Sequence, residues 1–248
     1  MKSIILLVFI FLSIAFTLTT DFLSDQKKYA RVQTAYNDKE AVVVKKLEEV
    51  NLNLDNINIL IAVYKHEQEL DIYVKKKGNT KYKQLKSYDI CSSSGKLGPK
   101  YKFGDNQVPE GFYYIDRFNP ASSYYLSLGL SYPNAADKLR SKASNLGGDI
   151  FIHGECVTIG CMPMTNDKIK EIYIYAIEAR KNGQLKIPVY IFPFRFTETN
   201  VSKFKKQYKS DSTLLNFWSN LKTGYDQFHS NLEEIKVTVN KNNGDYLF

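Results

Sequence analysis

The stretch DIFIHGECVTIGCMPM, residues 149–164, decides how the rest of the chain is interpreted. Its first residues are apolar and typical of a short strand that ends at His153, and a helical pattern begins soon after Cys161. Cysteine and histidine supply the thiol nucleophile and the base of covalent catalysis. Two of the three cysteines and one of the three histidines fall here, so this stretch is the candidate active site.

The spacing within this stretch is compatible with a thiol–imidazole pair. His153 and Cys161 are eight residues apart (161 − 153), and a turn through Gly160 would bring the two side chains together. Gly160 also allows a close backbone approach, so backbone N–H groups near Cys161 are expected to form an oxyanion hole. The carbonyl of Gly154 is expected to orient the imidazole. A helix after Thr165 would place its positive end near the thiol and favour the thiolate.

Two other interpretations of the same residues remain open at this point. A buried cysteine is usually an inert, small apolar side chain. A zinc site made of His153, Cys156 and Cys161 is also conceivable, although the stretch has no C-x-x-C pair and no second histidine. Residue types and spacing therefore favour thiol catalysis without excluding either alternative.

The chain divides into three parts by composition. Residues 1–20 carry a single lysine and an apolar centre, which indicates a signal peptide or a membrane anchor. Residues 21–56 read as an N-terminal helical segment, with an amphipathic helix over 24–50 that we expect to pack on the domain. Residues 57–248 form one domain, since no repeat or long linker interrupts them. An exported protein with three cysteines cannot pair all of them within the chain.

Short strands and a few helices alternate along the domain. We expect a hairpin of strands 60–65 and 70–75 around a turn that contains His66, a third strand that ends at 90–91, and further strands at 112–115, 124–128 and 187–194. Helices are predicted at 167–181 and 214–232, and closing strands at 235–239 and 246–248. His66 is interpreted as a solvated turn residue and His229 as a surface or packing residue. The predicted fold class is α+β, with a mixed sheet and flanking helices.

The net charge of +8 favours anionic partners. Nucleic acid is disfavoured because the chain has no arginine-rich run and no aromatic RNA-binding motif. An acidic cell-wall polymer and anionic lipid are the other anionic partners, and charge alone does not choose between them.

Several motifs, taken in order, resemble one known family. IHG at 152–154 with TIGC at 158–161 resembles the His-Gly and Ser/Thr-x-Gly-Cys motif of YkuD-type L,D-transpeptidase catalytic domains. Segments at 90–100, 104–113, 132–134, 192–195 and 217–225 are similar to the YafK-like branch of that family. The resemblance implies a YkuD-like mixed β-sheet sandwich with flanking helices.

The same resemblance implies a function. Cys161 would be the nucleophile, His153 its base, and the backbone of Gly154 and Gly160 would orient the histidine and bind the oxyanion. The substrate would be a peptidoglycan stem peptide, attacked at the L-centre carbonyl of its diamino acid through a Cys161 thioester. Hydrolysis of a stem or release of a wall-attached lipoprotein is preferred over transpeptidation, and a non-catalytic wall-binding module is the alternative from another class. No metal or organic cofactor is implied. The expected location is the periplasm, with membrane contact only through residues 1–20 if they are not cleaved.

The two other cysteines, Cys91 and Cys156, can be interpreted in more than one way. A Cys156–Cys161 disulfide would mask the nucleophile and act as a redox switch, although it requires the loop to fold back. Cys91 is expected to be a buried residue at the end of a strand.

Overall fold

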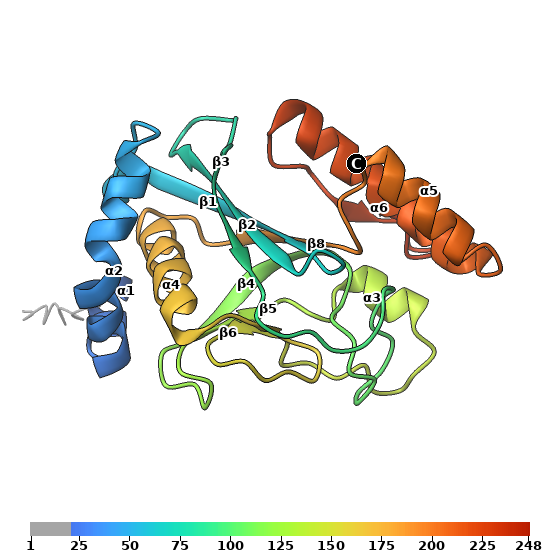
Figure 1. Cartoon of the computed structure of the whole chain (residues 1–248), viewed down its shortest axis with the longest axis horizontal. Helices are drawn as coiled ribbons and strands as arrows, with labels where there is room; N and C mark the ends of the chain where they lie inside the picture. The colour runs from blue at the N-terminus through green and yellow to red at the C-terminus, as the bar shows by residue number, and fades with distance from the viewer. Residues whose placement is uncertain (1–20) are drawn as a thin grey trace, which may run out of the picture.

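The computed structural model describes residues 21–248, so the predicted signal or anchor segment lies outside the described residues. One mixed sheet of eight strands runs through the molecule in the order β3-β2-β1-β8-β4-β5-β6-β7 (Figure 1). Its strands are β1 (Ile57–Tyr64), β2 (Glu69–Lys76), β3 (Lys83–Asp89), β4 (Gly111–Asn119), β5 (Ser127–Leu130), β6 (Phe151–His153), β7 (Met162–Pro163) and β8 (Ile187–Phe192). This confirms the predicted α+β class.

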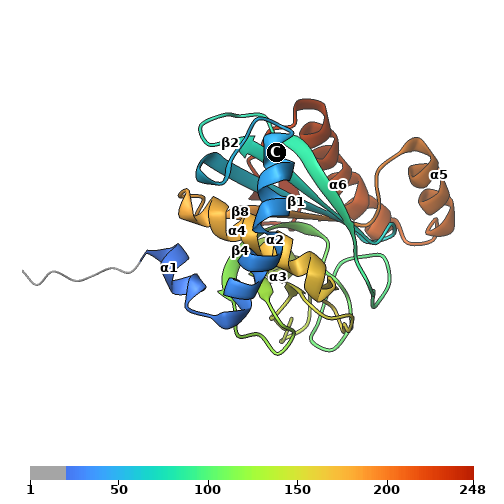
Figure 2. The ribbon, with the colours of Figure 1, turned by 60° about the vertical axis from the view of Figure 1, so that its left-hand side comes forward.

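Helices cover both faces of the sheet. The alternating side chains of β1 show this directly, because Ile59 and Ile61 enter one apolar cluster while Leu60 and Ala62 enter another. The first cluster is covered by α1 (Phe22–Lys27), α2 (Ala30–Glu48) and α4 (Asn166–Lys181), and the second by α5 (Glu198–Gln207) and α6 (Ser212–Asn231). Figures 1 and 2 show the blue and gold helices on one side and the red pair on the other.

The N-terminal amphipathic segment packs on the domain, as predicted. It forms two helices, α1 and α2, instead of one, with a break at Lys28 and Tyr29. Val32, Val43 and Leu47 are fully buried. The Tyr36 hydroxyl donates to the Glu178 carboxylate of α4 at 2.7 Å. The segment is therefore part of the core and not a free spacer.

Most predicted elements are present, with several differences. The predicted hairpin at 60–75 forms as β1 and β2, and the closing strands pair as β9 (Thr238–Val239) and β10 (Tyr246–Leu247). Two helices were not predicted, α3 (Ala135–Arg140) and α5. The strand expected at 124–128 begins only at Ser127, because Tyr125 adopts a positive φ of 72° that no strand accommodates.

Within residues 21–248, no helix is both long enough and apolar enough to cross a membrane.

The sheet curls until the chain leaving β3 meets β7. The N–H of Cys91 donates to the carbonyl of Pro163 at 3.0 Å. β3 and β7 are the two edge strands of the sheet, so this contact joins its opposite ends. The candidate active-site stretch lies at this junction.

Candidate active site

Strand pairing places His153 and Cys161 on the same side of the sheet. β6 and β7 are parallel neighbours, with Ile152 opposite Met162 and His153 opposite Pro163. Ile152 and Met162 are buried in the core shared with α4. Because side chains alternate along a strand, the flanking His153 and Cys161 both point away from that core.

The imidazole of His153 is held in one tautomer. Its Nδ1 lies 2.6 Å from the carbonyl oxygen of Gly154, and a carbonyl only accepts, so Nδ1 carries the hydrogen and Nε2 is left as a base. The Gly154 carbonyl therefore lies where its predicted orienting role requires it, and the role itself stays a prediction. A Cβ at Gly154 would lie 2.5 Å from Asn166 Oδ1 and 2.9 Å from the carbonyl of Tyr124, so the position requires glycine. The ring of Tyr124 covers the imidazole at 4.8 Å between centroids.

Cys161 is a free, half-buried thiol. Its Sγ lies 3.6 Å from the carbonyl oxygen of Asp149. Burial raises the pKa of the thiol, and the Asp149 charge adds to this, whereas a backbone hydrogen bond from Phe151 and the Lys100 charge oppose it. Burial and the Asp149 charge therefore oppose the thiolate that the helix after Thr165 is predicted to favour.

Burial also lowers the pKa of His153, although its hydrogen bond to Gly154 and the charge of Glu155 act in the opposite direction. Both members of the pair are thus neutral near pH 7. A neutral pair can still react, because the imidazole accepts the thiol proton as the sulfur attacks.

The turn before Cys161 depends on the hydroxyl of Thr158. Its Oγ1 accepts from the N–H groups of Gly160 at 3.1 Å and Cys161 at 2.8 Å, and it donates to the Cys161 carbonyl at 2.8 Å. Gly160 has a φ of +134°, and a Cβ there would lie 3.0 Å from the carbonyl of Gln107. Thr158 therefore occupies both N–H groups expected to bind an oxyanion, and the oxyanion role of Gly160 stays a prediction that requires the hydroxyl to turn away.

Cys161 lies on the wall of a cavity of about 290 Å³ between the two joined edges of the sheet. The loop after β3 forms the facing wall with Ser92, Ser93, Ser94 and Lys96, and Lys65 and His66 contribute from the end of β1. The hydroxyl oxygen of Ser94 is buried and has no hydrogen-bond partner among residues 21–248. The cavity thus combines a free thiol with several polar groups, as a peptide site would.

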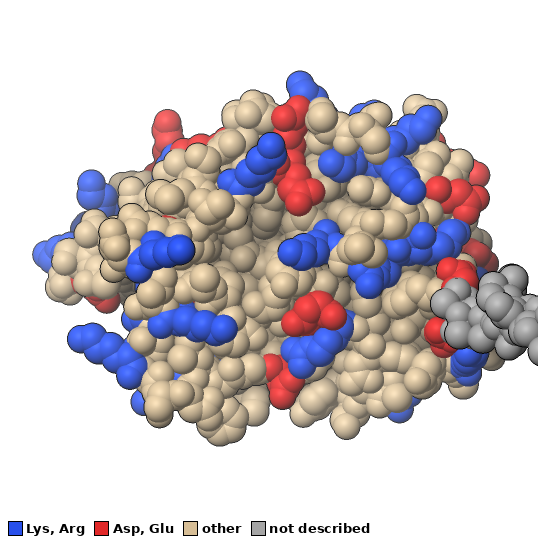
Figure 3. All heavy atoms as spheres, turned by 180° about the vertical axis from the view of Figure 1, so that it is seen from behind, with Lys and Arg blue, Asp and Glu red and all other residues tan. Residues whose placement is uncertain are grey.

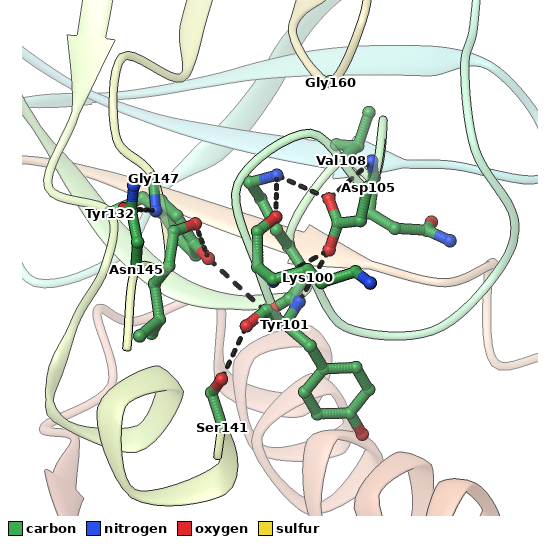
Figure 4. A network of polar contacts seen from close by, with 12 residues as sticks. Lys100, Tyr101, Asp105, Val108, Tyr132, Ser141, Asn145, Gly147 and Gly160 are labelled. Atoms are coloured by element: carbon green, nitrogen blue, oxygen red, sulfur yellow. Dashed lines mark hydrogen bonds and ion pairs between the residues drawn. The ribbon is translucent and has the colours of Figure 1, made fainter. Parts of the chain in front are cut away.

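Figure 4 shows how the loop over this cavity is fixed. Asp105 accepts hydrogen bonds from the N–H groups of Tyr101, Lys102 and Gln107 and from the ammonium of Lys100 at 2.5 Å. These bonds lower the pKa of the Asp105 carboxyl against the effect of its burial. A single carboxylate therefore holds the loop next to Gly160.

A second, fully buried group fixes the base of the same loop. The Glu110 carboxylate accepts from Lys65 at 2.9 Å, from the Gly98 N–H at 2.6 Å and from the Trp218 indole at 2.9 Å. Lys65 also donates to the carbonyls of Gly98 and Val108. This cluster connects β1, the loop and α6.

The structure pairs Cys91 with Cys156 in a disulfide whose Cα atoms are 5.6 Å apart. The Cys156–Cys161 disulfide considered as a redox switch is therefore not formed. Cys91 follows the end of β3 as predicted, but it is half-buried and cross-linked, not buried. The considered zinc site is not assembled either, because the Cys156 sulfur is in the disulfide. Among residues 21–248, no cluster of three or more histidine, cysteine, aspartate or glutamate side chains is arranged to hold a metal.

The other histidines lie outside the thiol–imidazole pair. His66 is exposed in the predicted turn, but it also lines the cavity, which the sequence did not indicate. His229 stacks on Tyr225 at 3.8 Å and contacts the Tyr64 hydroxyl, so its packing role is confirmed. Thr158 and Tyr124 are the site residues that sequence reasoning missed, although the Thr-x-Gly-Cys spacing is compatible with a side-chain cap of the turn.

The pKa directions give a testable pH profile. Alkylation of Cys161 by iodoacetamide is expected to stay slow at pH 7 and to rise only above pH 9, since burial raises the thiol pKa from 9.0. The His153 imidazole is expected to titrate below its ordinary 6.5. Mass spectrometry of the alkylated peptide measures the reaction of Cys161, with Cys161→Ser as the blank. NMR measures the titration of the His153 imidazole. Thiolate absorbance at 240 nm near pH 7 would contradict the neutral pair.

Replacing Thr158 tests the turn. Thr158→Val removes the acceptor for two N–H groups, which is expected to cost about 1–3 kcal/mol of unfolding free energy. Thr158→Ser keeps the hydroxyl and is expected to lie close to the parent. Urea unfolding measures both variants. Equal stability of the valine and serine variants would show that the hydroxyl does not hold the turn.

Comparison with known proteins agrees with this geometry. A family model described as the L,D-transpeptidase catalytic domain, YkuD, matches residues 58–191, which include His153 and Cys161. The chain is 40% identical over 191 residues to the putative L,D-transpeptidase YafK of Escherichia coli K12, covering 76% of this chain and 73% of the relative.

Two solved structures are similar at a greater distance. The helical cell shape determining protein Pgp2 from Campylobacter jejuni has 19% identity and a TM-score of 0.45, over 79% of each chain. Bd1075 of Bdellovibrio bacteriovorus has 20% identity and a TM-score of 0.40, over 74% of this chain and 75% of that one. On the family match and the 40% identical relative, the chain belongs to the L,D-transpeptidase catalytic domain family of YkuD type.

Proposed function

We propose that this protein is an exported cysteine enzyme that cleaves peptidoglycan stem peptides at the L-centre carbonyl of the diamino acid. The observation that carries the proposal is the arrangement of Cys161 and His153. The free thiol lies at the wall of a polar cavity, on the same side of the sheet as an imidazole whose Nδ1–H is fixed by Gly154. Family membership supports peptidoglycan as the substrate class.

The reaction would begin with proton transfer from Cys161 to His153 Nε2 as the sulfur attacks the carbonyl carbon. The tetrahedral oxyanion would be bound by backbone N–H groups once the Thr158 hydroxyl releases them. The imidazolium would then donate its proton to the departing amine, and a Cys161 thioester would remain. Attack by water, with His153 again as the base, would release a carboxylate and restore the thiol.

The size of the cavity supports water as the acceptor. Its volume is about 290 Å³, just below the range of roughly 300–1,000 Å³ that holds a drug-sized ligand. One peptide arm fills such a space, whereas transpeptidation must hold a donor and an acceptor peptide together. Hydrolysis of a stem, or release of a wall-attached lipoprotein from the same carbonyl, therefore fits better than cross-linking.

The charge of the protein suits an acidic wall polymer. Lysine and arginine side chains are spread over the face in Figure 3, with smaller acidic groups between them. Lys96, an exposed residue, brings a positive charge to the cavity wall, where a carboxylate of the stem would be attracted. Export is supported by the composition of residues 1–20 and by the Cys91–Cys156 disulfide, which is typical of oxidising compartments.

Purified muropeptides test the proposal. The protein is incubated with tetrapeptide stems, with cross-linked stems and with lipoprotein-linked stems, and the products are identified by mass spectrometry. Addition of one water mass per cleaved bond indicates hydrolysis, and joined stems indicate transfer. No product and no acylated Cys161 with any of the three substrates would reject the proposed function.

A further inference from the structure

The Cys91–Cys156 disulfide lies where the two edges of the sheet meet at the cavity. Cys91 follows β3, and its N–H donates to Pro163 of β7 at 3.0 Å. Cys156 lies in the loop of residues 154–160, which connects His153 to Cys161. The cross-link joins positions 65 residues apart in sequence. It therefore ties the loop between the two catalytic residues to the opposite wall of the cavity.

Little else holds the middle of this loop to the body of the protein. The Glu155 N–H donates to Asn166 Oδ1 at 2.9 Å, and Glu155 has a positive φ of 63°. Beyond Cys156, the hydrogen bonds of Thr158 stay within the loop. Val157 is 55% exposed and Ile159 is 80% exposed, so apolar packing anchors neither. The disulfide is thus the main tie between residue 155 and the turn at Gly160.

The disulfide also determines which thiols are free. Cys156 precedes Cys161 by five residues, with Gly160 between them. If Cys156 were a thiol, a disulfide such as oxidised glutathione could accept two electrons and two protons from Cys156 and Cys161 and leave them bonded to each other. The nucleophile would then be lost. Pairing with Cys91 prevents this while leaving Cys161 reduced.

We propose that the Cys91–Cys156 disulfide is a positioning cross-link, which holds the 154–160 loop so that Cys161 stays at the cavity wall and keeps Cys156 from forming a disulfide with Cys161 when an oxidant such as oxidised glutathione is present. The inference rests on the proposed role of Cys161 as nucleophile. Cys91, which follows β3, would then help to protect and position the Cys161 thiol.

The first experiment compares Cys91→Ser, Cys156→Ser and the double variant in the full chain. Each is treated with oxidised glutathione, and the free thiols are then labelled with iodoacetamide and mapped by mass spectrometry. Labelling of Cys161 is expected to fall at least about tenfold in Cys91→Ser, to recover with dithiothreitol, and to be unaffected in the double variant. Full labelling of Cys161 in oxidised Cys91→Ser would overturn the protective role.

The second experiment tests positioning. The parent is folded first and its disulfide is then reduced by dithiothreitol, whose own thiols form a cyclic disulfide, so no variant has to fold. The pH at which Cys161 becomes alkylated is expected to shift downward after reduction and in the double variant, because a released loop exposes the thiol. If the cross-link only adds stability, its reduction or removal would lower the melting temperature and leave this pH profile unchanged. That result would overturn the positioning role.

Activity measurements distinguish a failure of the role inferred for the disulfide from a failure of the proposed function. If stems are cleaved, kcat/KM is expected to fall by about a hundredfold in the double variant, mainly through kcat. If no stem is cleaved by the parent, the two thiol experiments still decide the role of the disulfide, because neither uses peptidoglycan.

Discussion

Cys161→Ala is expected to abolish the acyl-enzyme, and His153→Ala to lower kcat/KM for the stem peptide by about 10²- to 10⁴-fold. Alanine at 161 leaves no atom that can form the thioester. Alanine at 153 leaves a thiol whose pKa is raised by burial and which has no base to accept its proton. Both side chains point away from the apolar core. Because His153 is only 2% exposed and packs on Tyr124, the melting temperature of His153→Ala is measured with the kinetics to separate lost folding from lost chemistry.

Intact-mass spectrometry of the protein with excess stem peptide measures the acyl-enzyme, and single-turnover kinetics measures its formation. His229→Gln is the matched control, since His229 packs against Tyr225 of α6, outside the cavity. It is expected to acylate at the parental rate. Acylation of His153→Ala at that rate would show that another group takes the thiol proton.

Local patterns predicted the parts of the fold that local forces determine. The hairpin of β1 and β2 follows from two apolar runs around a polar turn, and α4 from apolar residues at helical spacing. The pairing of β1 with β8 is parallel and joins residues more than 120 positions apart. No local period encodes such a pairing, so the strand order could not be predicted from residue patterns.

In the candidate active site, too, contacts between sequence neighbours could be predicted, whereas contacts that depend on the whole fold could not. Gly154 and His153 are sequence neighbours, so their hydrogen bond could be predicted. The disulfide joins Cys91 to Cys156 only because the sheet curls, and the thiol pKa depends on burial by the whole fold. The sequence did not show why the motifs at 104–113 and 217–225 contain Asp105, Glu110 and Trp218. In the structure, hydrogen bonds of these residues hold the loop that follows β3.

Glu110→Ala is expected to lower the free energy of unfolding by about 3–5 kcal/mol. The side chains of Lys65 and Glu110 are only 7% and 0% exposed, so the change leaves a buried ammonium without its counter-ion. It also removes the acceptor of the Gly98 N–H and the Trp218 indole. Asp226→Ala, which breaks the exposed Lys222–Asp226 pair, is the control and is expected to cost at most about 1 kcal/mol.

The pH dependence of the unfolding free energy of Glu110→Gln tests whether the charge of Glu110 is what stabilises the fold. Burial lowers the pKa of Lys65, and the charge of Glu110 partly restores it, so glutamine is expected to lower that pKa further. The folded variant then binds fewer protons than the unfolded chain, and its stability must rise with pH as Lys65 becomes neutral. Urea unfolding from pH 7 to 10 should therefore show the deficit of Glu110→Gln shrinking relative to the parent. If the loss of unfolding free energy in Glu110→Gln did not change with pH, the hydrogen bonds of Glu110, and not its buried charge, would account for its stabilising effect.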